Sequence, residues 1–173
     1  MKKTYLLIFL IVLFIISCSK EDNEFRLSDF SIPTINGYYQ RDLVANIIGI
    51  VGTPNVRLGN STGFNNSIYY FFCYPNPCSK GLCAIHIKAP IKNEIKKLWI
   101  TPAYFNNQGS NNSIDLNNSS NIFIGGSPVF QTEFTSNDLT VNLSQIPNGY
   151  YRIYLKVNGY LLYDNLLIYK LNK

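Results

Sequence analysis

The stretch GYYRIYLKVNGYLLYDNLLIYK, residues 149–170, decides the fold class of this chain. Alternate residues of its first half would lie on one face of a strand, namely Tyr151, Ile153, Leu155 and Val157. Asn158-Gly159 then supplies two residue types that accept the positive φ angles of a type I′ turn, and a second apolar run follows. The stretch therefore predicts a β-hairpin with strands over 149–157 and 160–169.

Short apolar runs separated by glycine, proline and asparagine continue this pattern through the rest of the chain. They cover residues 43–51, 55–59, 67–73, 82–88, 95–101, 122–124, 128–135 and 139–143. No run keeps the i, i+3, i+4, i+7 spacing of an amphipathic helix for three turns. The 13 tyrosines and 11 phenylalanines also fit a pleated, half-buried surface better than a helix. The chain is therefore predicted to be all-β, as a sandwich or a barrel.

The first 17 residues have the composition of an export signal. Lys2 and Lys3 precede an apolar run from Tyr5 to Ile16, which at about 12 residues is shorter than the roughly 20 of a membrane-spanning helix. The run ends at Ile15-Ile16-Ser17-Cys18, which resembles a bacterial lipoprotein box. The resemblance implies cleavage before Cys18 and acylation of that cysteine with chains such as palmitate, which would anchor the protein to a membrane.

A charged segment directly follows this cysteine and indicates on which membrane face the protein is placed. Ser19-Lys20-Glu21-Asp22 resembles the export signal that places lipoproteins on the outer face of the outer membrane in Bacteroidetes. The alternative, an ordinary secretory signal with a chance cysteine, does not account for this segment. We therefore expect residues 18–36 to form a lipidated tether at the cell exterior and residues 37–173 to form one folded domain.

Composition limits the partners of the mature chain. Removal of the signal takes away two lysines and lowers the formal net charge from +5 to +3, and no run of Lys or Arg remains. This small, dispersed charge gives no basis for binding nucleic acid. The remaining chain is long enough for a single domain with a buried core. The Asn-rich stretch at 106–121 is typical of a long loop, which either serves recognition on a rigid scaffold or is slack.

Two short motifs, in order along the chain, point to a known module. The first is Tyr74-Pro75-Asn76-Pro77, followed by a turn at Ser79-Lys80-Gly81. The second is Ile146-Pro147-Asn148-Gly149-Tyr150-Tyr151, followed by a hairpin and a lysine-bearing last strand. Together they resemble the C-terminal domain of proteins exported by the type IX secretion system of Bacteroidetes, a small immunoglobulin-like β-sandwich. The resemblance covers residues 74–173 and implies a single immunoglobulin-like β-sandwich of short antiparallel strands.

The chain departs from this family in ways that bear on function. Only residues 18–73 of the mature chain precede the resembling part, whereas family members carry a large passenger there. Residues 102–127 form a long insert, and the chain carries its own lipid anchor. The main prediction is therefore a domain kept for binding or scaffolding, and the sorting function that the family implies is one alternative.

Three cysteines lie close together in the segment FFCYPNPCSKGLC, residues 71–83. In the oxidising compartment outside the cytoplasm a disulfide is expected. It would join Cys78 to Cys83 across the turn, or Cys73 to Cys78 around the Tyr-Pro-Asn-Pro turn. The alternative is a zinc site completed by His86, but its spacing lacks the Cys-x2-Cys knuckle of zinc fingers. We therefore expect no metal site, with one thiol left unpaired.

The residue pattern gives little basis for catalysis. His86 is the only histidine, and no Asp or Glu lies within seven residues of it. The chain also lacks a nucleophile elbow and a Gly-rich phosphate loop. We therefore predict that the protein is not an enzyme and uses no cofactor.

A binding surface is the better candidate site. It consists of outward positions of the strand at 149–157 together with the single tryptophan of the chain: Tyr150, Arg152, Tyr154, Lys156 and Trp99, with Tyr104 as an addition. Aromatic and Arg side chains are enriched at interface hot spots, although the same residues also suit plain cross-strand pairs. We expect a protein or glycan partner at the cell surface. The alternatives are a small-ligand carrier with a lipocalin-like barrel and a domain that engages the secretion machinery.

Overall fold

The computed structural model describes residues 32–60, 68–91, 93–106 and 127–170. Their strands are β1 (Thr34–Ile35), β2 (Gly37–Arg41), β3 (Ile47–Gly52), β4 (Tyr70–Tyr74), β5 (Leu82–Lys88), β6 (Lys96–Pro102), β7 (Tyr104–Phe105), β8 (Phe130–Phe134), β9 (Asp138–Asn142), β10 (Gly149–Val157) and β11 (Tyr160–Ile168). Within these ranges no helix has the length and apolarity that crossing a membrane requires. The expected strand at 122–124 lies outside the described residues.

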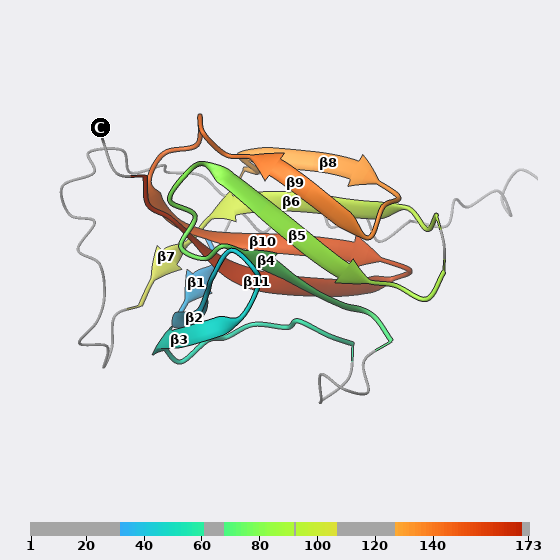
Figure 1. The fold of residues 1–173 in the computed structure, drawn as a ribbon, viewed down its shortest axis with the longest axis horizontal. Coiled ribbons are helices and arrows are strands. Elements are labelled where there is room, and N and C mark those ends of the chain that lie inside the picture. Colours follow the sequence, from blue (N-terminus) through green and yellow to red (C-terminus); the bar gives the residue numbers. More distant parts are fainter. Residues whose placement is uncertain (1–31, 61–67, 92, 107–126, 171–173) are drawn as a thin grey trace, which may run out of the picture.

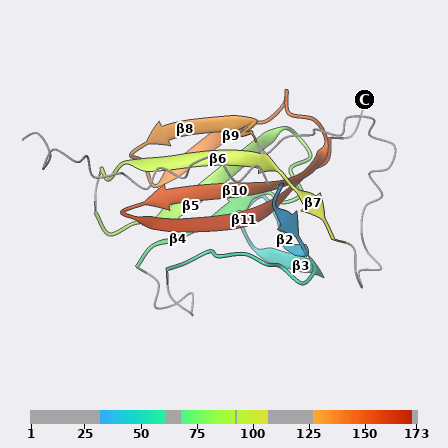
Figure 2. The ribbon, with the colours of Figure 1, turned by 180° about the vertical axis from the view of Figure 1, so that it is seen from behind.

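Seven of these strands form a sandwich of two antiparallel sheets. One sheet has the order β4-β5-β9 and the other has the order β11-β10-β6-β8. In chain order the seven strands take positions A, B, C, C′, E, F and G of an immunoglobulin-like sandwich. Figures 1 and 2 show the two layers from opposite sides. The predicted all-β sandwich is therefore confirmed. The alternative prediction of a lipocalin-like barrel is wrong, because these seven strands form two separate sheets and not one closed barrel.

The core lies between the two layers and follows the period of two in the sequence. The inward residues of both sheets are almost completely buried, among them Phe71, Ile85, Ile87, Leu98, Ile100, Ile153 and Leu155. The predicted alternation of β10 is confirmed, because Tyr151, Ile153, Leu155 and Val157 all belong to this core. The predicted turn is also present, since Asn158 and Gly159 have φ angles of 45° and 77° and Val157 pairs with Tyr160.

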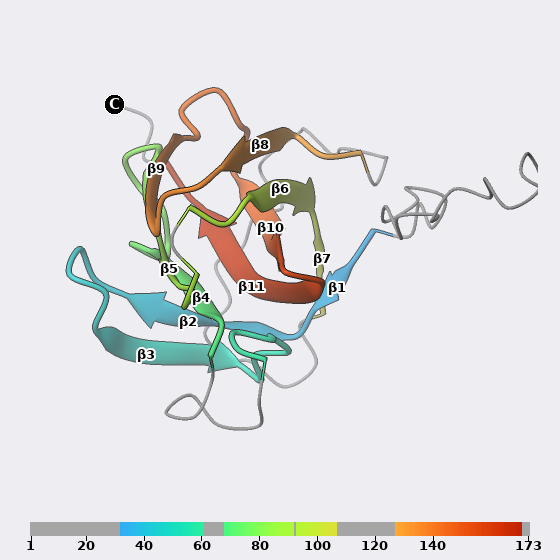
Figure 3. The same cartoon turned by 90° about the vertical axis from the view of Figure 1, so that its right-hand side faces the viewer.

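Residues 37–52 form a hairpin beside the sandwich, where the sequence pattern predicts a single strand over 43–51. β2 and β3 pair antiparallel with an irregularity between Gln40 and Arg41. The turn forms inside the apolar run because the Asp42 carboxylate accepts hydrogen bonds from the backbone N–H groups of Val44 and Asn46. Figure 3 shows the hairpin lying alongside the two sheets, and its buried Tyr38 and Val51 pack with Leu167 of β11.

The folded part begins before residue 37, inside the segment that the sequence pattern assigns to the tether. β1 pairs parallel with β7, so that Thr34 lies opposite Tyr104 and Ile35 opposite Phe105. Ile35 is completely buried. Two residues are too short a run to show a strand period, so this contact left no signal in the sequence.

The second sequence motif builds the corner that leads into β10. The Tyr151 hydroxyl donates a hydrogen bond of 2.9 Å to the backbone oxygen of Pro147, which is the tyrosine corner of immunoglobulin-like sandwiches. Burial raises the pKa of Tyr151 to about 12. Lys170 donates to the backbone oxygens of Ser144 and Ile146, and Asn148 binds both backbone polar groups of Lys170. This motif and the lysine after the last strand therefore stabilise one corner of the fold.

Candidate binding surface

The outer face of the four-stranded sheet carries a row of aromatic side chains. The register places Tyr154 of β10 opposite Trp99 of β6 on one side and opposite Tyr163 of β11 on the other. The rings of Trp99 and Tyr154 are stacked, with centroids 5.2 Å apart and an interplanar angle of 13°. The Tyr163 ring is tilted by 57° against Tyr154, with centroids 6.0 Å apart. We call Trp99, Tyr154 and Tyr163 the aromatic row.

The aromatic row is fixed in place and half-buried. Its members come from three adjacent strands of one sheet, so their spacing follows from the strand spacing of about 4.8 Å. Each of the three side chains keeps part of its surface accessible to solvent. Burial is the largest cause of the raised pKa of Tyr154, so its hydroxyl stays neutral at physiological pH. A preformed group of rings of this kind can stack on sugar rings or on apolar peptide side chains without ordering flexible groups first.

Arg152, a member of the predicted surface, is used to hold the structure together. Its guanidinium donates to the side-chain oxygen of Asn165 and to the backbone oxygens of Thr34 and Asn55. It also lies over the Tyr163 ring, 4.9 Å from the centroid. Arg152 therefore attaches the segments around residues 34 and 55 to the sheet and supports one member of the aromatic row.

Tyr150, another member of the predicted surface, is half-buried and packs against rings of other strands. Its ring stacks on Phe105, with centroids 4.3 Å apart, and lies 6.2 Å from the ring of Tyr38. Burial raises the pKa of Tyr150 to about 12. Tyr150 thus joins β10 to β7 and β2. Tyr104, the suggested addition, is exposed on β7.

Lys156 lies in the row of residues next to the aromatic row. It faces Lys97 of β6 in the register, and Lys97 forms an exposed ion pair of 3.1 Å with Glu133 of β8. Of the five residues proposed for binding, the structure therefore brings Trp99, Tyr154 and Lys156 together on one outer face. Arg152 and Tyr150 instead contact other segments of the domain.

Sequence reasoning missed Tyr163, although a signal for it was present. A two-residue turn at Asn158-Gly159 fixes the register of the whole hairpin, so that Tyr154 must face Tyr163. Counting outward from the turn would have added Tyr163 to the surface.

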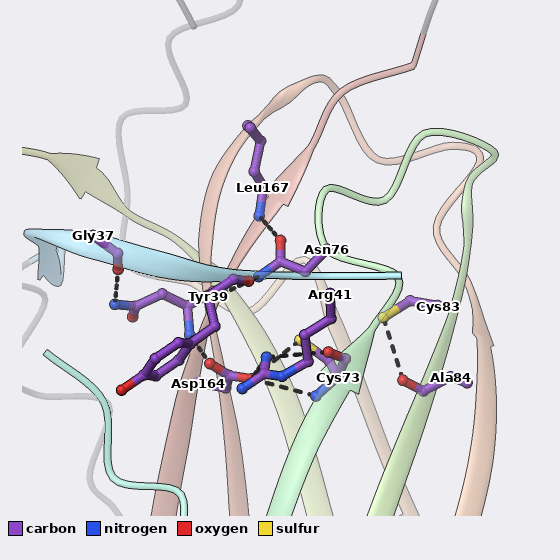
Figure 4. Close-up of polar contacts among 10 residues, drawn as sticks. Gly37, Tyr39, Arg41, Cys73, Asn76, Cys83, Ala84, Asp164 and Leu167 are labelled. Atoms are coloured by element: carbon purple, nitrogen blue, oxygen red, sulfur yellow. Dashed lines mark hydrogen bonds and ion pairs between the residues drawn. The ribbon is translucent and has the colours of Figure 1, made fainter. Parts of the chain in front are cut away.

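A buried ion pair joins the β2–β3 hairpin to the last strand. Arg41 Nη1 of β2 lies 2.8 Å from Asp164 Oδ2 of β11, and both side chains are almost completely shielded from solvent. Figure 4 shows that Cys73 completes this cluster: its backbone N–H and its thiol donate to the same carboxylate, and its backbone oxygen accepts from Arg41. The Arg41 guanidinium also lies over the rings of Tyr39 and Phe72. The charge of Asp164 is therefore fully compensated inside the protein.

Asn76, at the centre of the Tyr-Pro-Asn-Pro motif, is a second buried connection. Its side-chain amide donates to the backbone oxygens of Tyr39 and Asn165 and accepts from the backbone N–H of Leu167. Its own backbone groups pair with those of Arg41. Figure 4 shows Asn76 between β2 and β11. The Tyr-Pro-Asn-Pro motif thus supplies the polar side chain, Asn76, that joins the β2–β3 hairpin and the end of β4 to β11.

All three cysteines face the core as free thiols, so neither predicted disulfide is formed in the structure. Cys73 lies opposite Ile85 in the register of β4 and β5, and its thiol is hydrogen-bonded with that of Cys83. Cys78 also lies near Cys83, while its backbone pairs with Ile168 and its thiol donates to the Leu82 oxygen. A zinc site would need His86 beside the thiols, but the thiols face the core whereas the His86 side chain is exposed on the outer face. Over the described ranges no three His, Cys, Asp or Glu side chains gather as a metal site requires.

The three core thiols are expected to react only after unfolding. The neighbouring Cys83 thiol and burial raise the pKa of Cys73, and burial raises the pKa of Cys78 to about 11, so thiolate is scarce at pH 8. Titration of a Cys18→Ser chain with a thiol reagent should therefore give no fast reaction in buffer and three reactive groups in denaturant. A single reactive group in denaturant would show that two of the cysteines are joined by a disulfide.

His86 has a partner that the sequence did not reveal. Its Nδ1 atom lies 2.7 Å from Asp138 Oδ1, across the pair of β5 and β9. The Phe72 ring lies 5.5 Å from the imidazole. Asp138 is 52 residues away in the chain, which is why a search of neighbouring residues did not find it.

The lipidation and export residues Cys18, Ser19, Lys20, Glu21 and Asp22 lie outside the described residues, as does nearly all of the loop at 106–121.

No family model matches the chain, and no curated protein matches it significantly. A solved structure of a DUF3244 family protein from Bacteroides vulgatus, with an immunoglobulin-like β-sandwich fold, is similar over 65% of this chain and 95% of its own, at 11% identity and a TM-score of 0.38. The strand order described above, and not this distant similarity, carries the assignment of the fold.

Proposed function

We propose that the chain is an outer-membrane lipoprotein, anchored through Cys18 and facing the cell exterior, with a non-catalytic role in binding or scaffolding. The observation that carries the binding role is the aromatic row on a rigid outer sheet face. The N-terminal segment supports the location, because a segment that resembles a lipoprotein box is followed directly by Ser19-Lys20-Glu21-Asp22. A glycan or a protein segment with apolar groups is the partner chemistry that the rings favour.

The location is tested by protease treatment of intact cells. The native protein should be digested, and a variant with Lys20, Glu21 and Asp22 replaced by alanine should be protected, because it would stay on the inner leaflet. A Cys18→Ala variant should not incorporate labelled palmitate. Protection of the native protein would contradict the exterior location and favour a scaffolding role inside the envelope.

The binding role is tested on an array of surface glycans and on an extract of envelope proteins. A Trp99→Ala variant should weaken any binding by about tenfold or more, as truncation of a hot-spot aromatic residue does. Tyr160→Ala is the matched control, because Tyr160 is an exposed aromatic residue at the start of β11 whose ring lies tilted against Tyr69, 5.2 Å away, and not in the aromatic row. Equal losses in the two variants would exclude the aromatic row as the binding site.

A further inference from the structure

The β2–β3 hairpin presents an unusual number of aliphatic side chains to solvent. Five large aliphatic residues within eight positions are between 57% and 73% exposed: Leu43, Val44, Ile47, Ile48 and Ile50. We call these five residues the aliphatic patch. Single exposed apolar residues are ordinary, but a contiguous group marks an interaction site.

The hairpin holds the aliphatic patch in a fixed position. At its tip, the Asp42 carboxylate binds the backbone of Val44 and Asn46 and the side chain of Asn46. At its base, Arg41 is paired with buried Asp164, and the Asn165 amide donates to the Gly37 oxygen. The patch is therefore a built feature of the domain and not a fraying segment.

The shape of the patch favours a lipid surface over an added strand. Leu43 and Val44 lie in the turn beyond Arg41 and Ile47, the last pair of the β2–β3 ladder. A strand added along β3 would not cover them, and the irregularity at Gln40 and Arg41 also makes β3 a poor edge for pairing. A lipid interface would cover the turn and the outer face of β3 together. Residues 43–52 contain no charged side chain that would oppose this contact.

The length of the chain before the domain brings that surface within reach. Fourteen residue steps separate Cys18 from Ile32, the first described residue, and they span at most roughly 50 Å. A domain of this size is roughly 35 Å across. The tether can thus be longer than the domain is wide, so an acylated Cys18 would leave the hairpin, which follows the tether directly, free to turn toward the bilayer and reach it. This step rests on the proposed lipid anchor.

We propose that the aliphatic patch docks on the lipid bilayer that holds the anchor, with Leu43 and Val44 entering the boundary between headgroups and acyl chains. The contact gives the tethered domain a fixed orientation. Since the tip side chains are exposed in the folded protein, their replacement by polar residues should leave stability unchanged and affect only the contact with lipid.

The test uses the mature polypeptide from residue 18 with Cys18→Ser, so that no acyl chain contributes. Its sedimentation with phosphatidylethanolamine and phosphatidylglycerol vesicles is compared with that of a Leu43→Ser/Val44→Ser variant. Partition of the first should exceed that of the second by about tenfold or more, because two aliphatic side chains are withdrawn from lipid. The matched control is Leu82→Ser/Ile95→Ser, which changes two exposed aliphatic residues outside the hairpin and should bind as the parent does. Urea unfolding of all three checks that the fold is intact.

Two outcomes would overturn the proposal. One is the absence of vesicle binding by the parent, or an equal loss in both double variants. The other is a dimer of the parent that the Leu43→Ser/Val44→Ser variant dissociates, without vesicle binding, which would assign the patch to a second copy of the chain. Palmitate labelling of the full chain separates this proposal from the proposed function. Vesicle binding without labelling refutes the anchor alone, and labelling without vesicle binding refutes the docking alone.

Discussion

Replacement of Asp164 by alanine is expected to lower the free energy of unfolding by about 3 to 5 kcal/mol. The substitution leaves the Arg41 guanidinium buried without its carboxylate and removes the acceptor for the backbone N–H and thiol of Cys73. Because a domain of this size is stable by only about 5 to 15 kcal/mol, the loss is a large share of the total. Equilibrium unfolding in urea measures it directly.

Two control variants separate the buried charge from charge in general. Glu133→Ala removes the carboxylate of the exposed pair with Lys97 and should cost less than about 1 kcal/mol. Arg41→Met combined with Asp164→Leu removes both buried charges and should recover much of the loss, since apolar residues of similar size replace the pair. Equal destabilisation by Asp164→Ala and Glu133→Ala would contradict the burial of the pair.

Asn76→Ala is expected to destabilise the domain by about 3 kcal/mol or more, because it removes three hydrogen bonds to backbone groups, two of them buried and one part-buried, at about 1 to 3 kcal/mol each. These are the oxygens of Tyr39 and Asn165 and the N–H of Leu167. The measurement is again urea unfolding, paired with surface labelling of cells that express the variant at a permissive low temperature.

The matched control for this prediction is Asn142→Ala. Asn142 is an exposed strand residue whose side chain accepts one local hydrogen bond from Ser144, so its replacement should cost much less. The surface label distinguishes a structural role of the Tyr-Pro-Asn-Pro motif from a sorting role. Folded Asn76→Ala protein that fails to reach the surface would contradict the structural interpretation.

Local pattern was sufficient to predict most of the sandwich. The predicted strand at 82–88 and the first strand of the 149–170 hairpin have the observed bounds, since alternation and an Asn-Gly turn act over a few residues. The β2–β3 hairpin was not predicted, because its turn lies within a nearly continuous apolar run and depends on one side chain, Asp42. The pairing of β1 with β7 depends on residues about 70 positions apart, which no local pattern reports.

The candidate site was only partly predictable for the same reason. Outward alternation assigned Tyr154 and Lys156 to one face of their strand, and the register of the sheet then places Tyr154 opposite Trp99. The same alternation could not show that Arg152 binds residues from the distant N-terminal segment. Nor could it show that Asp164, which lies in the correctly predicted hairpin at 149–170, is the buried partner of Arg41. Polar contacts between remote segments depend on the assembled fold.

The bond between Arg41 and Asp164 also constrains when this protein can fold. The two residues are 123 positions apart, and Asp164 lies in the last strand. Contacts between such remote positions form late, because the intervening chain must first be ordered. A chain that leaves the cytoplasm with its N-terminus first presents β2 long before β11 emerges. On the proposed export route the domain would therefore stay unfolded during its passage across the inner membrane, and β2 and β11 would join only after synthesis and translocation are complete.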